Sequence, residues 1–225
     1  MLGDSVKVLE TLDDSSIDIV ITDPPYGVNY TSNWSKDQSR FSKIPIVNDT
    51  LEEAKQLLDK VCEILVRKTK TQAHIYIFTR WDVYPEMKAI VDKYFTVKNL
   101  LVWDTCSHGM GDLTHAWGNQ TEYIIFAIKG NKELVKRMPN ILKFYKASDD
   151  YVHSTQKPVA LITKLLNASA HDNDVICDPF MGGGSTIRAA VVRGNLNYIG
   201  IEIDKNIFER AKKFIESKMN EVKLW

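Results

Sequence analysis

A short apolar run, Ile17 to Thr22, most restricts the fold that this chain can adopt. Four of its six residues are isoleucine or valine, which is typical of a strand buried on both faces of a parallel sheet. The run ends at residues 23–26, Asp-Pro-Pro-Tyr, and sheets of this kind place ligand sites just beyond the carboxyl ends of their strands. The sequence therefore predicts a functional turn directly after this strand.

The two prolines predict that this turn is rigid. Each proline fixes φ and lacks a backbone N–H. Pro24 and Pro25 would hold their carbonyls beside the Asp23 carboxylate, and such a row of hydrogen-bond acceptors suits an amino group. Taken alone, the same residues also fit a simple cap before a loop.

A second pattern combines a short strand, a glycine turn and a helix. Val175 to Cys177 is apolar, residues 178–184 read Asp-Pro-Phe-Met-Gly-Gly-Gly, and a helix is predicted from Ser185 to Val192. Glycines let a ligand approach the backbone while the helix amino terminus faces it, and an acidic residue about 20 positions on is expected to bind ribose. Glu202, at the end of a predicted strand over 197–203, fits that place. A glycine turn alone also fits a plain structural turn or a nicotinamide-dependent oxidoreductase, but the latter leaves the proline motif unexplained.

Strands and helices alternate along the rest of the chain. Strands are predicted over 17–22, 73–79, 97–103, 123–128, 175–177 and 197–203, and helices over 51–66, 85–94, 158–170 and 185–192. Asp49 or Thr50 would cap the helix that begins at Leu51. This alternation predicts an α/β fold with a doubly wound, mostly parallel sheet.

Length and composition fit one domain over residues 1–225, because a chain of 225 residues, 44% of them hydrophobic, can bury one full sheet between helices. No apolar run approaches the length of a membrane span, and the first residues lack the pattern of a secretion signal. We therefore expect a cytoplasmic protein with no membrane partner. The three cysteines, Cys62, Cys106 and Cys177, are far apart and have no His or Cys at ligand spacing, so reduced thiols and no metal site are expected.

The charges balance, with 29 basic and 29 acidic residues, which is unusual for a chain that binds a polyanion. Their distribution is uneven, because seven basic and three acidic residues lie between Lys129 and Lys157. Phosphate contacts are expected from this stretch, at Lys132, Lys136, Arg137 and Lys143. The segment 27–48 interrupts the alternation directly after the proline turn, and we expect it to form a lid over the site.

Further motifs are Gly3 with Asp4, Trp103 with residues 109–111 (Gly-Met-Gly), and residues 122–130 (EYIIFAIKG), 153–158 (HSTQKP) and 199–204 (IGIEID). With the proline and glycine motifs, they resemble over nearly the whole chain the amino-methyltransferases of DNA, in particular the circularly permuted beta class, in which the catalytic motif precedes the cofactor motif. Ser154, Gly183 and Ser185 depart from the family, which commonly has Pro, a small hydroxyl residue and Thr there. The family's target-recognition segment corresponds to residues 130–152. The sheet of this family includes a strand just before the position of Gly3. In this chain, the tail Glu221 to Trp225 is expected to fill that place.

The resemblance implies S-adenosylmethionine as the cofactor, released as S-adenosylhomocysteine, and no metal. Asp4 is expected to bind the amino group of the cofactor's adenine, Glu202 its ribose, and Phe180 to pack on the methyl donor. Gly182 and Gly184 would allow close approach of the ligand to the backbone. The other implied contacts are His153, Thr155, Gln156 and Lys157 at the methionine end, together with Asp178, Ser185 and Asp204.

The implied activity is site-specific transfer of a methyl group to the N6 amine of an adenine flipped out of double-stranded DNA. Asp23 and the Pro24 carbonyl would accept the two N–H groups of the amine, next to Pro25, and Tyr26 would stack on the base. DNA contacts are expected from the lid, at Asn29, Tyr30, Trp34, Lys36 and Arg40, and from the four basic residues named above. A homodimer would supplement the short recognition segment, and a cognate restriction nuclease is a further partner that the resemblance allows.

Three alternatives stay open. Cytosine-N4 members of the family more often carry Ser at the position of Asp23, which favours adenine without excluding cytosine. Methyltransferases of RNA or of protein amides share the acceptor turn, but they usually have the cofactor motif first. A DNA-binding module without turnover is the third alternative, although every expected catalytic group is present. Methylation at cytosine carbon 5 is disfavoured, because it needs a thiolate and no cysteine lies in a Pro-Cys turn.

Overall fold

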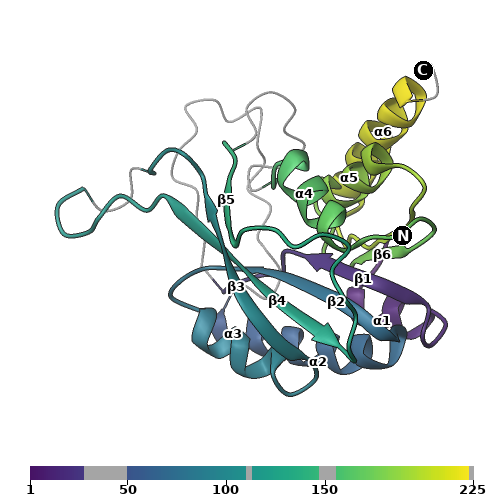
Figure 1. The fold of residues 1–225 in the computed structure, drawn as a ribbon, viewed down its shortest axis with the longest axis horizontal. Coiled ribbons are helices and arrows are strands. Elements are labelled where there is room, and N and C mark those ends of the chain that lie inside the picture. The colour runs from purple at the N-terminus through teal and green to yellow at the C-terminus, as the bar shows by residue number, and fades with distance from the viewer. Residues whose placement is uncertain (28–49, 110–112, 147–155, 223–225) are drawn as a thin grey trace.

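The computed structural model describes residues 1–27, 50–109, 113–146 and 156–222 of the chain. Within these ranges, seven strands form one sheet in the order β5-β3-β4-β2-β1-β6-β7 (Figure 1). The strands are β1 (Ile17–Thr22), β2 (Thr69–Thr79), β3 (Thr96–Asp104), β4 (Thr121–Lys129), β5 (Ile141–Lys143), β6 (Val175–Asp178) and β7 (Asn197–Gly200). Among these strands, β4 is antiparallel to its neighbours β2 and β3, and the other pairings are parallel. The predicted mostly parallel sheet is confirmed.

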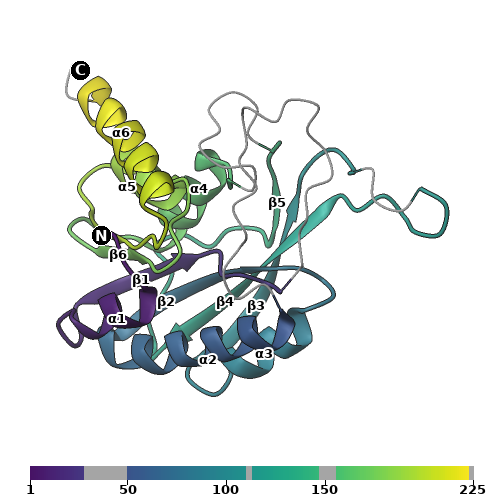
Figure 2. The ribbon, with the colours of Figure 1, turned by 180° about the vertical axis from the view of Figure 1, so that it is seen from behind.

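Helices cover both faces of the sheet, as Figures 1 and 2 show from opposite sides. One face carries α1 (Ser5–Glu10), α2 (Leu51–Lys68) and α3 (Tyr84–Val91), and the other carries α4 (Val159–Ser169) and α5 (Ser185–Arg193), with α6 (Lys205–Val222) packed on α5. In β1, Ile17 and Val20 pack toward α1–α3, whereas Ile19 and Ile21 pack toward α4 and α5. Burial on both faces explains why this strand is an apolar run without alternation, and the doubly wound fold is confirmed.

The long helix α2 begins where its capping signal predicts. Thr50 is the N-cap, its hydroxyl oxygen accepts a hydrogen bond from the Glu53 amide, and the Glu53 carboxylate accepts one from the Thr50 amide. This reciprocal pair satisfies two amides that a helix start leaves without partners. At its other end α2 passes directly into β2, which therefore begins at Thr69, four residues before its predicted start.

The prediction for the tail was wrong. Residues 221 and 222 belong to α6, and residues 223–225 lie outside the described ranges. The place beside Glu202 is taken instead by the first residues of the chain. Leu2 forms a parallel bridge with Glu202, and the Gly3 amide donates to the Glu202 carbonyl at 2.9 Å. Because β7 ends at Gly200, Glu202 lies just beyond the strand rather than within it.

The segments expected to touch DNA are described in part. Residues 28–49 of the predicted lid lie outside the described ranges. A side chain at Gly27 would collide with the backbone of Leu51, so the described residues on either side of this segment lie next to each other. The recognition segment, described from 130 to 146, is more than a loop, because β5 extends the sheet beside β3. No helix among the described residues is long and apolar enough to cross a membrane.

Candidate active site

The proline and glycine motifs meet at one edge of the sheet. Their strands, β1 and β6, are parallel neighbours with Val20 opposite Cys177, so their carboxyl ends coincide. The Thr22 hydroxyl donates to the Asp178 carboxylate at 2.8 Å across this pair. From β1 the chain continues to β2 on one side of this pair, and from β6 it continues to β7 on the other side. The point at which the strand order of a doubly wound sheet diverges in this way is its usual ligand site.

Asp23, directly after β1, is surrounded by hydrogen-bond donors. The Tyr26 hydroxyl donates to its Oδ1, and Lys157 Nζ lies 2.8 Å from its Oδ2. The same ammonium lies 3.2 Å from Oε2 of Glu122, whose Oε1 is 2.9 Å from Lys146 Nζ. Charges of alternating sign therefore run from Asp23 through Lys157 and Glu122 to Lys146, ending at a side chain that is 58% exposed.

Burial and these neighbours set the protonation of the network. Burial raises the pKa of Asp23, although the nearby Lys157 opposes the shift. Burial alone would lower the pKa of Lys157, but the two carboxylates outweigh it and the pKa is raised. For Glu122, burial is outweighed by Lys157 and Lys146, and the pKa is lowered. Lys157 is therefore a cation and Glu122 a carboxylate at neutral pH.

The position of Lys157 differs from the one expected. The sequence placed its ammonium at the methionine end of a cofactor, but the structure places it between Asp23 and Glu122, with 10% of its side chain exposed. The reason is electrostatic, because two partly buried carboxylates require a cation between them. The Ser185 hydroxyl donates to the Lys157 carbonyl at 2.7 Å, so Ser185 also binds this segment rather than facing a ligand.

The glycine turn forms an open cradle between β6 and α5. Gly182 and Gly184 have φ values of +48° and +81°, in the left-handed region that favours glycine. A Cβ at Gly182 would meet nothing within 4 Å, whereas one at Gly184 would lie 3.0 Å from Ile215 Cδ1. Gly184 is the N-cap of α5 and no side-chain hydrogen bond caps this helix start. The amides at the start of α5 can therefore bind a negatively charged ligand group beside the cradle.

Asp178 and its neighbours hold the turn in place. Asp178 is 3% exposed, and besides Thr22 it accepts the Phe180 amide at 3.1 Å. Burial raises its pKa to about 6. The buried Asp178 carboxylate thus cross-links β1 and β6 through the Thr22 hydroxyl, and its cofactor contact stays a prediction. The Phe180 side chain is partly buried against the core beneath α1–α3.

Three other predicted cofactor carboxylates lie near the ends of helices and strands. The Glu202 carboxylate accepts the Asp204 amide at 2.8 Å, and burial raises its pKa. Asp204 accepts the amides of residues 206 and 207 at 2.8 and 2.9 Å, at the start of α6. Asp4 accepts the Lys7 amide at 3.0 Å as the N-cap of α1. Asp4 and Asp204 thus cap helices, while Glu202 lies beside the cradle that the sequence predicts.

The basic residues expected to touch phosphate are not equivalent. Lys132 lies 3.2 Å from Asp174 Oδ2, near the amino ends of β1 and β6, and its side chain is only 10% exposed. It is too buried, and at the wrong edge, to contact DNA bound at Asp23. Lys136 lies toward the same edge, where its amide donates to the Ala168 carbonyl at the end of α4. Arg137 borders a cavity of about 610 Å³ between α4 and the sheet.

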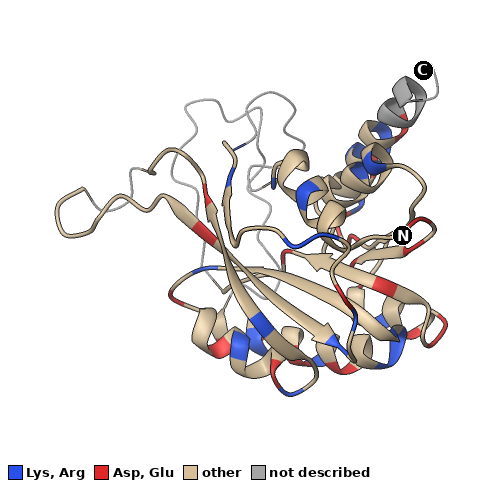
Figure 3. Cartoon of the chain, viewed as in Figure 1, with Lys and Arg blue, Asp and Glu red and all other residues tan. Residues whose placement is uncertain are grey.

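Lys143 does lie at the carboxyl edge of the sheet, where Asp23 also lies. It is exposed, and it pairs in register with Asp104 at the carboxyl end of β3. In the view of Figure 3, basic and acidic residues are interspersed rather than gathered on one element. The expected residues Asn29, Tyr30, Trp34, Lys36, Arg40, His153 and Thr155 lie outside the described ranges, and Gln156 directly precedes Lys157.

Sequence reasoning missed two features of this edge. Glu122 and Lys146 were not selected, although Glu122 begins the motif EYIIFAIKG. The connection between β3 and β4 projects beyond the sheet (Figure 1) and exposes Leu113 by 80% and Trp117 by 99%. In the part of the chain that is described, no group of three or more His, Cys, Asp or Glu side chains could hold a metal ion.

Comparison with known proteins assigns the family. The family model described as DNA methylase matches residues 17–213, so the chain belongs to this family of N6 and N4 methyltransferases. It is 30% identical to the protein YubD of Escherichia coli strain K12 over 89% of this chain and 82% of that protein. It is 26% identical to the Type II methyltransferase M.HpaI of Haemophilus parainfluenzae, over 97% and 74% of the respective chains. The crystal structure of the M1.HpyAVI-SAM complex matches with a TM-score of 0.71 at 21% identity, over 94% of this chain and 96% of that one. The fold is therefore the α/β methyltransferase fold.

Proposed function

We propose that this chain transfers a methyl group from S-adenosylmethionine to the N6 amine of an adenine flipped out of double-stranded DNA, and that its motif order makes it a circularly permuted, beta-class member of the family. One observation carries the proposal. The acceptor turn after β1 and the open glycine cradle after β6 lie side by side at the same sheet edge. An amine acceptor site and a cofactor site must adjoin for direct methyl transfer.

The acceptor turn supplies what an exocyclic amine lacks. The lone pair of that nitrogen is delocalised into the base, so the amine is a weak nucleophile until both N–H groups are bound by acceptors. Asp23 and the Pro24 carbonyl are the acceptors, and their fixed positions lower the barrier through preorganised electrostatics. A carboxylate offers about four lone-pair sites, of which Tyr26 and Lys157 use two, so Asp23 can accept the amine as well. As the nitrogen gains the methyl group it gives up a proton, which Asp23 accepts or passes to water.

The cradle supplies the cofactor site. When bound, S-adenosylmethionine provides a methyl group on a positively charged sulfur and leaves as S-adenosylhomocysteine. The space in front of Gly182 admits the ligand against the backbone, and the start of α5 suits the methionine carboxylate. We assign the ribose hydroxyls of the cofactor to Glu202 and its methyl donor to Phe180. The methionine end stays assigned to His153, Thr155 and Gln156. Tyr26 is the proposed stacking partner of the flipped base, and stacking offsets part of the unstacking cost of a few kcal/mol.

Duplex DNA would lie across the carboxyl edge of the sheet. Lys143 and the exposed side chains of Leu113 and Trp117 are the described residues best placed to meet it. The short recognition segment favours a homodimer, which analytical ultracentrifugation with and without DNA would test. A cognate nuclease stays a prediction from the family resemblance.

The labelled nucleoside tests the function. The purified protein is incubated with mixed-sequence duplex DNA and isotopically labelled S-adenosylmethionine, and the digested DNA is analysed by mass spectrometry. Labelled N6-methyladenine is expected, and Asp23→Asn should reduce the rate at least about 100-fold because it removes the charged acceptor. Asp92→Asn, at an exposed ion pair on α3, is the matched control.

Labelled N4-methylcytosine instead would keep the mechanism and change the base. An Asp23→Asn variant that transfers methyl groups at the wild-type rate would refute the assignment of Asp23 as the catalytic acceptor. No label in DNA despite cofactor binding would refute the DNA substrate and direct the search to RNA or protein amides.

A further inference from the structure

We propose that Lys157 is a positioning residue that keeps the Asp23 carboxylate ionised and oriented toward the substrate amine, and that Glu122, which shares the Lys157 ammonium, moderates this effect. The proposal rests on the proposed function, since it concerns the same Asp23. It adds two residues, Lys157 and Glu122, that touch neither the base nor the cofactor in this arrangement and act through Asp23.

Four contacts fix Lys157. Its carbonyl accepts the Ser185 hydroxyl at 2.7 Å, which ties the backbone to the start of α5. Its ammonium lies 5.3 Å from the centre of the Phe78 ring, so part of the charge is directed against an aromatic face. The same ammonium contacts Asp23 and Glu122 at 2.8 and 3.2 Å. If this side chain swung aside, Asp23 would lose its contacting cation and Glu122 would keep Lys146 alone.

The charges in the network balance. Asp23 and Glu122 carry two negative charges, and Lys157 and Lys146 carry two positive ones, in alternating order. The groups that bear on Asp23 in the described structure are Tyr26 in its own turn, Lys157 before α4, Glu122 on β4 and Asp178 on β6. Lys157 is the cation in contact with Asp23, so it is the group that favours the ionised form of this partly buried carboxyl.

Two substitutions should shift the Asp23 titration in opposite directions. Lys157→Met removes the cation and keeps an unbranched chain of similar length, so the pKa of Asp23 should rise by about 1–3 units. Glu122→Gln keeps the shape of the side chain but removes the carboxylate that competes for Lys157 and that raises the pKa of Asp23. The Asp23 pKa should therefore fall in Glu122→Gln. Loss of packing alone gives no reason for shifts of opposite sign.

The titration is measured directly in the free protein. Aspartate labelled with carbon-13 at its side-chain carboxyl is incorporated, and the Asp23 resonance is assigned by its loss in Asp23→Asn. Its chemical shift is followed against pH in the wild type, in Lys157→Met and in Glu122→Gln. Lys88→Met, which removes an exposed ion pair on α3, is the control and should leave the Asp23 titration unchanged. A thermal melt of each variant checks folding.

Opposite shifts in the two variants would support the proposal, and Lys157→Arg, which retains the charge, should move the titration less than Lys157→Met. An unchanged Asp23 pKa in Lys157→Met, or shifts in the same direction in both variants, would overturn it. If Lys157→Met does not fold, the sign of the Glu122→Gln shift decides, because an upward or absent shift contradicts the argument. The titration needs neither DNA nor cofactor, so its failure is distinguishable from a failure of the labelled-nucleoside assay.

Discussion

Replacing Asp178 by Asn should change how the stability of the protein depends on pH. Asp178 is 3% exposed, and its carboxylate accepts the Thr22 hydroxyl at 2.8 Å and the Phe180 amide at 3.1 Å. Burial raises its pKa from 3.8 to about 6, by more than these hydrogen bonds lower it. An Asn carbonyl oxygen can accept the same two hydrogen bonds but cannot ionise.

The sign and the size follow from proton linkage. Below about pH 4, Asp178 is protonated in the folded and the unfolded state, and its ionisation does not affect folding. Between about pH 4 and pH 6 the unfolded chain releases the proton and the folded protein keeps it, so the free energy of unfolding falls as the pH rises. Above pH 6 the loss is complete. A difference of about two pKa units corresponds to about 3 kcal/mol.

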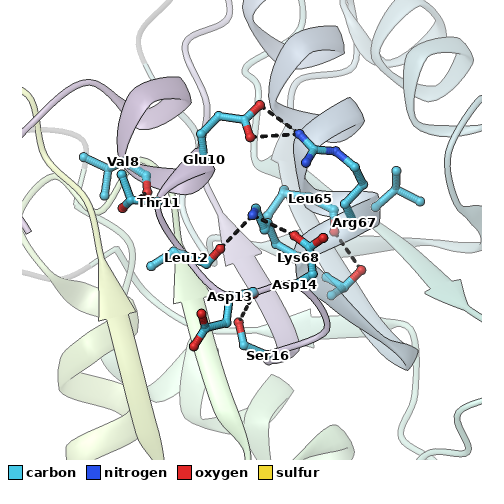
Figure 4. Close-up of polar contacts among 12 residues, drawn as sticks. Val8, Glu10, Thr11, Leu12, Asp13, Asp14, Ser16, Leu65, Arg67 and Lys68 are labelled. Carbon is cyan, nitrogen blue, oxygen red and sulfur yellow. Dashed lines mark hydrogen bonds and ion pairs between the residues drawn. The ribbon is translucent and has the colours of Figure 1, made fainter.

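Urea denaturation from about pH 4 to pH 7 measures this effect as the difference between the wild type and Asp178→Asn. Relative to Asp178→Asn, the wild type should lose about 3 kcal/mol across this range. Asp14→Asn is the control. Hydrogen bonding to Lys68, shown in Figure 4, lowers the pKa of Asp14. The stability that this carboxylate contributes is gained as the pH rises to about 4, so the difference between the wild type and Asp14→Asn should change little from about pH 4 to pH 7. Parallel pH dependences of the wild type and Asp178→Asn would refute the reasoning about burial.

Two further predictions concern the surface and the thiols. Lys143→Met should reduce the slope of the logarithm of DNA affinity against the logarithm of salt concentration by about one unit. Lys132→Met should leave that slope unchanged but lower the melting temperature, because Asp174 loses its ion-pair partner. Equal slopes for Lys143→Met and the wild type would show that Lys143 does not contact DNA. Native protein treated with iodoacetamide should be alkylated at Cys106, while Cys62 and Cys177, both fully buried with raised thiol pKa values, should react only after unfolding. Mass spectrometry of the digest checks this, and a native adduct on Cys177 would contradict it.

Elements with a strong local signal could be predicted from the sequence. The strand Ile17–Thr22 has its predicted ends, and α2 begins after Thr50, one of the two caps proposed for it. Elements that depend on partners could not be predicted in the same way. The three residues of β5 are exposed, buried and exposed in turn, and they form a strand because the edge of β3 is available to pair with them. The tail is apolar enough for a strand, but α6 continues into it and Leu2 occupies the place beside Glu202.

The residues of the candidate site also divide into those with a local sequence signal and those that depend on distant contacts. The places of Asp23, Gly182 and Glu202 at the carboxyl edge of the sheet could be predicted, because each follows a strand or lies in a turn with a recognisable pattern. Their surroundings depend on distant contacts. From the sequence alone, Lys132 and Lys143 are two lysines in one basic stretch. In the structure, the Lys132 side chain is only 10% exposed and lies near the amino ends of β1 and β6, whereas Lys143 is exposed at the carboxyl edge. A count of charges cannot separate them, because the intervening chain crosses from one edge of the sheet to the other.

The direction of one strand gives Asp23 its electrostatic partners. Glu122 is the second residue of β4, and β4 is antiparallel to β2 and β3, so its first residues lie at the same edge as the carboxyl ends of the parallel strands. In a parallel β4, Glu122 would lie at the opposite edge, and Lys157 would have Asp23 as its one carboxylate. The pKa of Asp23 would then be lower and the carboxylate a weaker proton acceptor. The antiparallel direction of β4 therefore affects the electrostatics of the site as well as the fold, because it places Glu122 where it shares the Lys157 ammonium with Asp23.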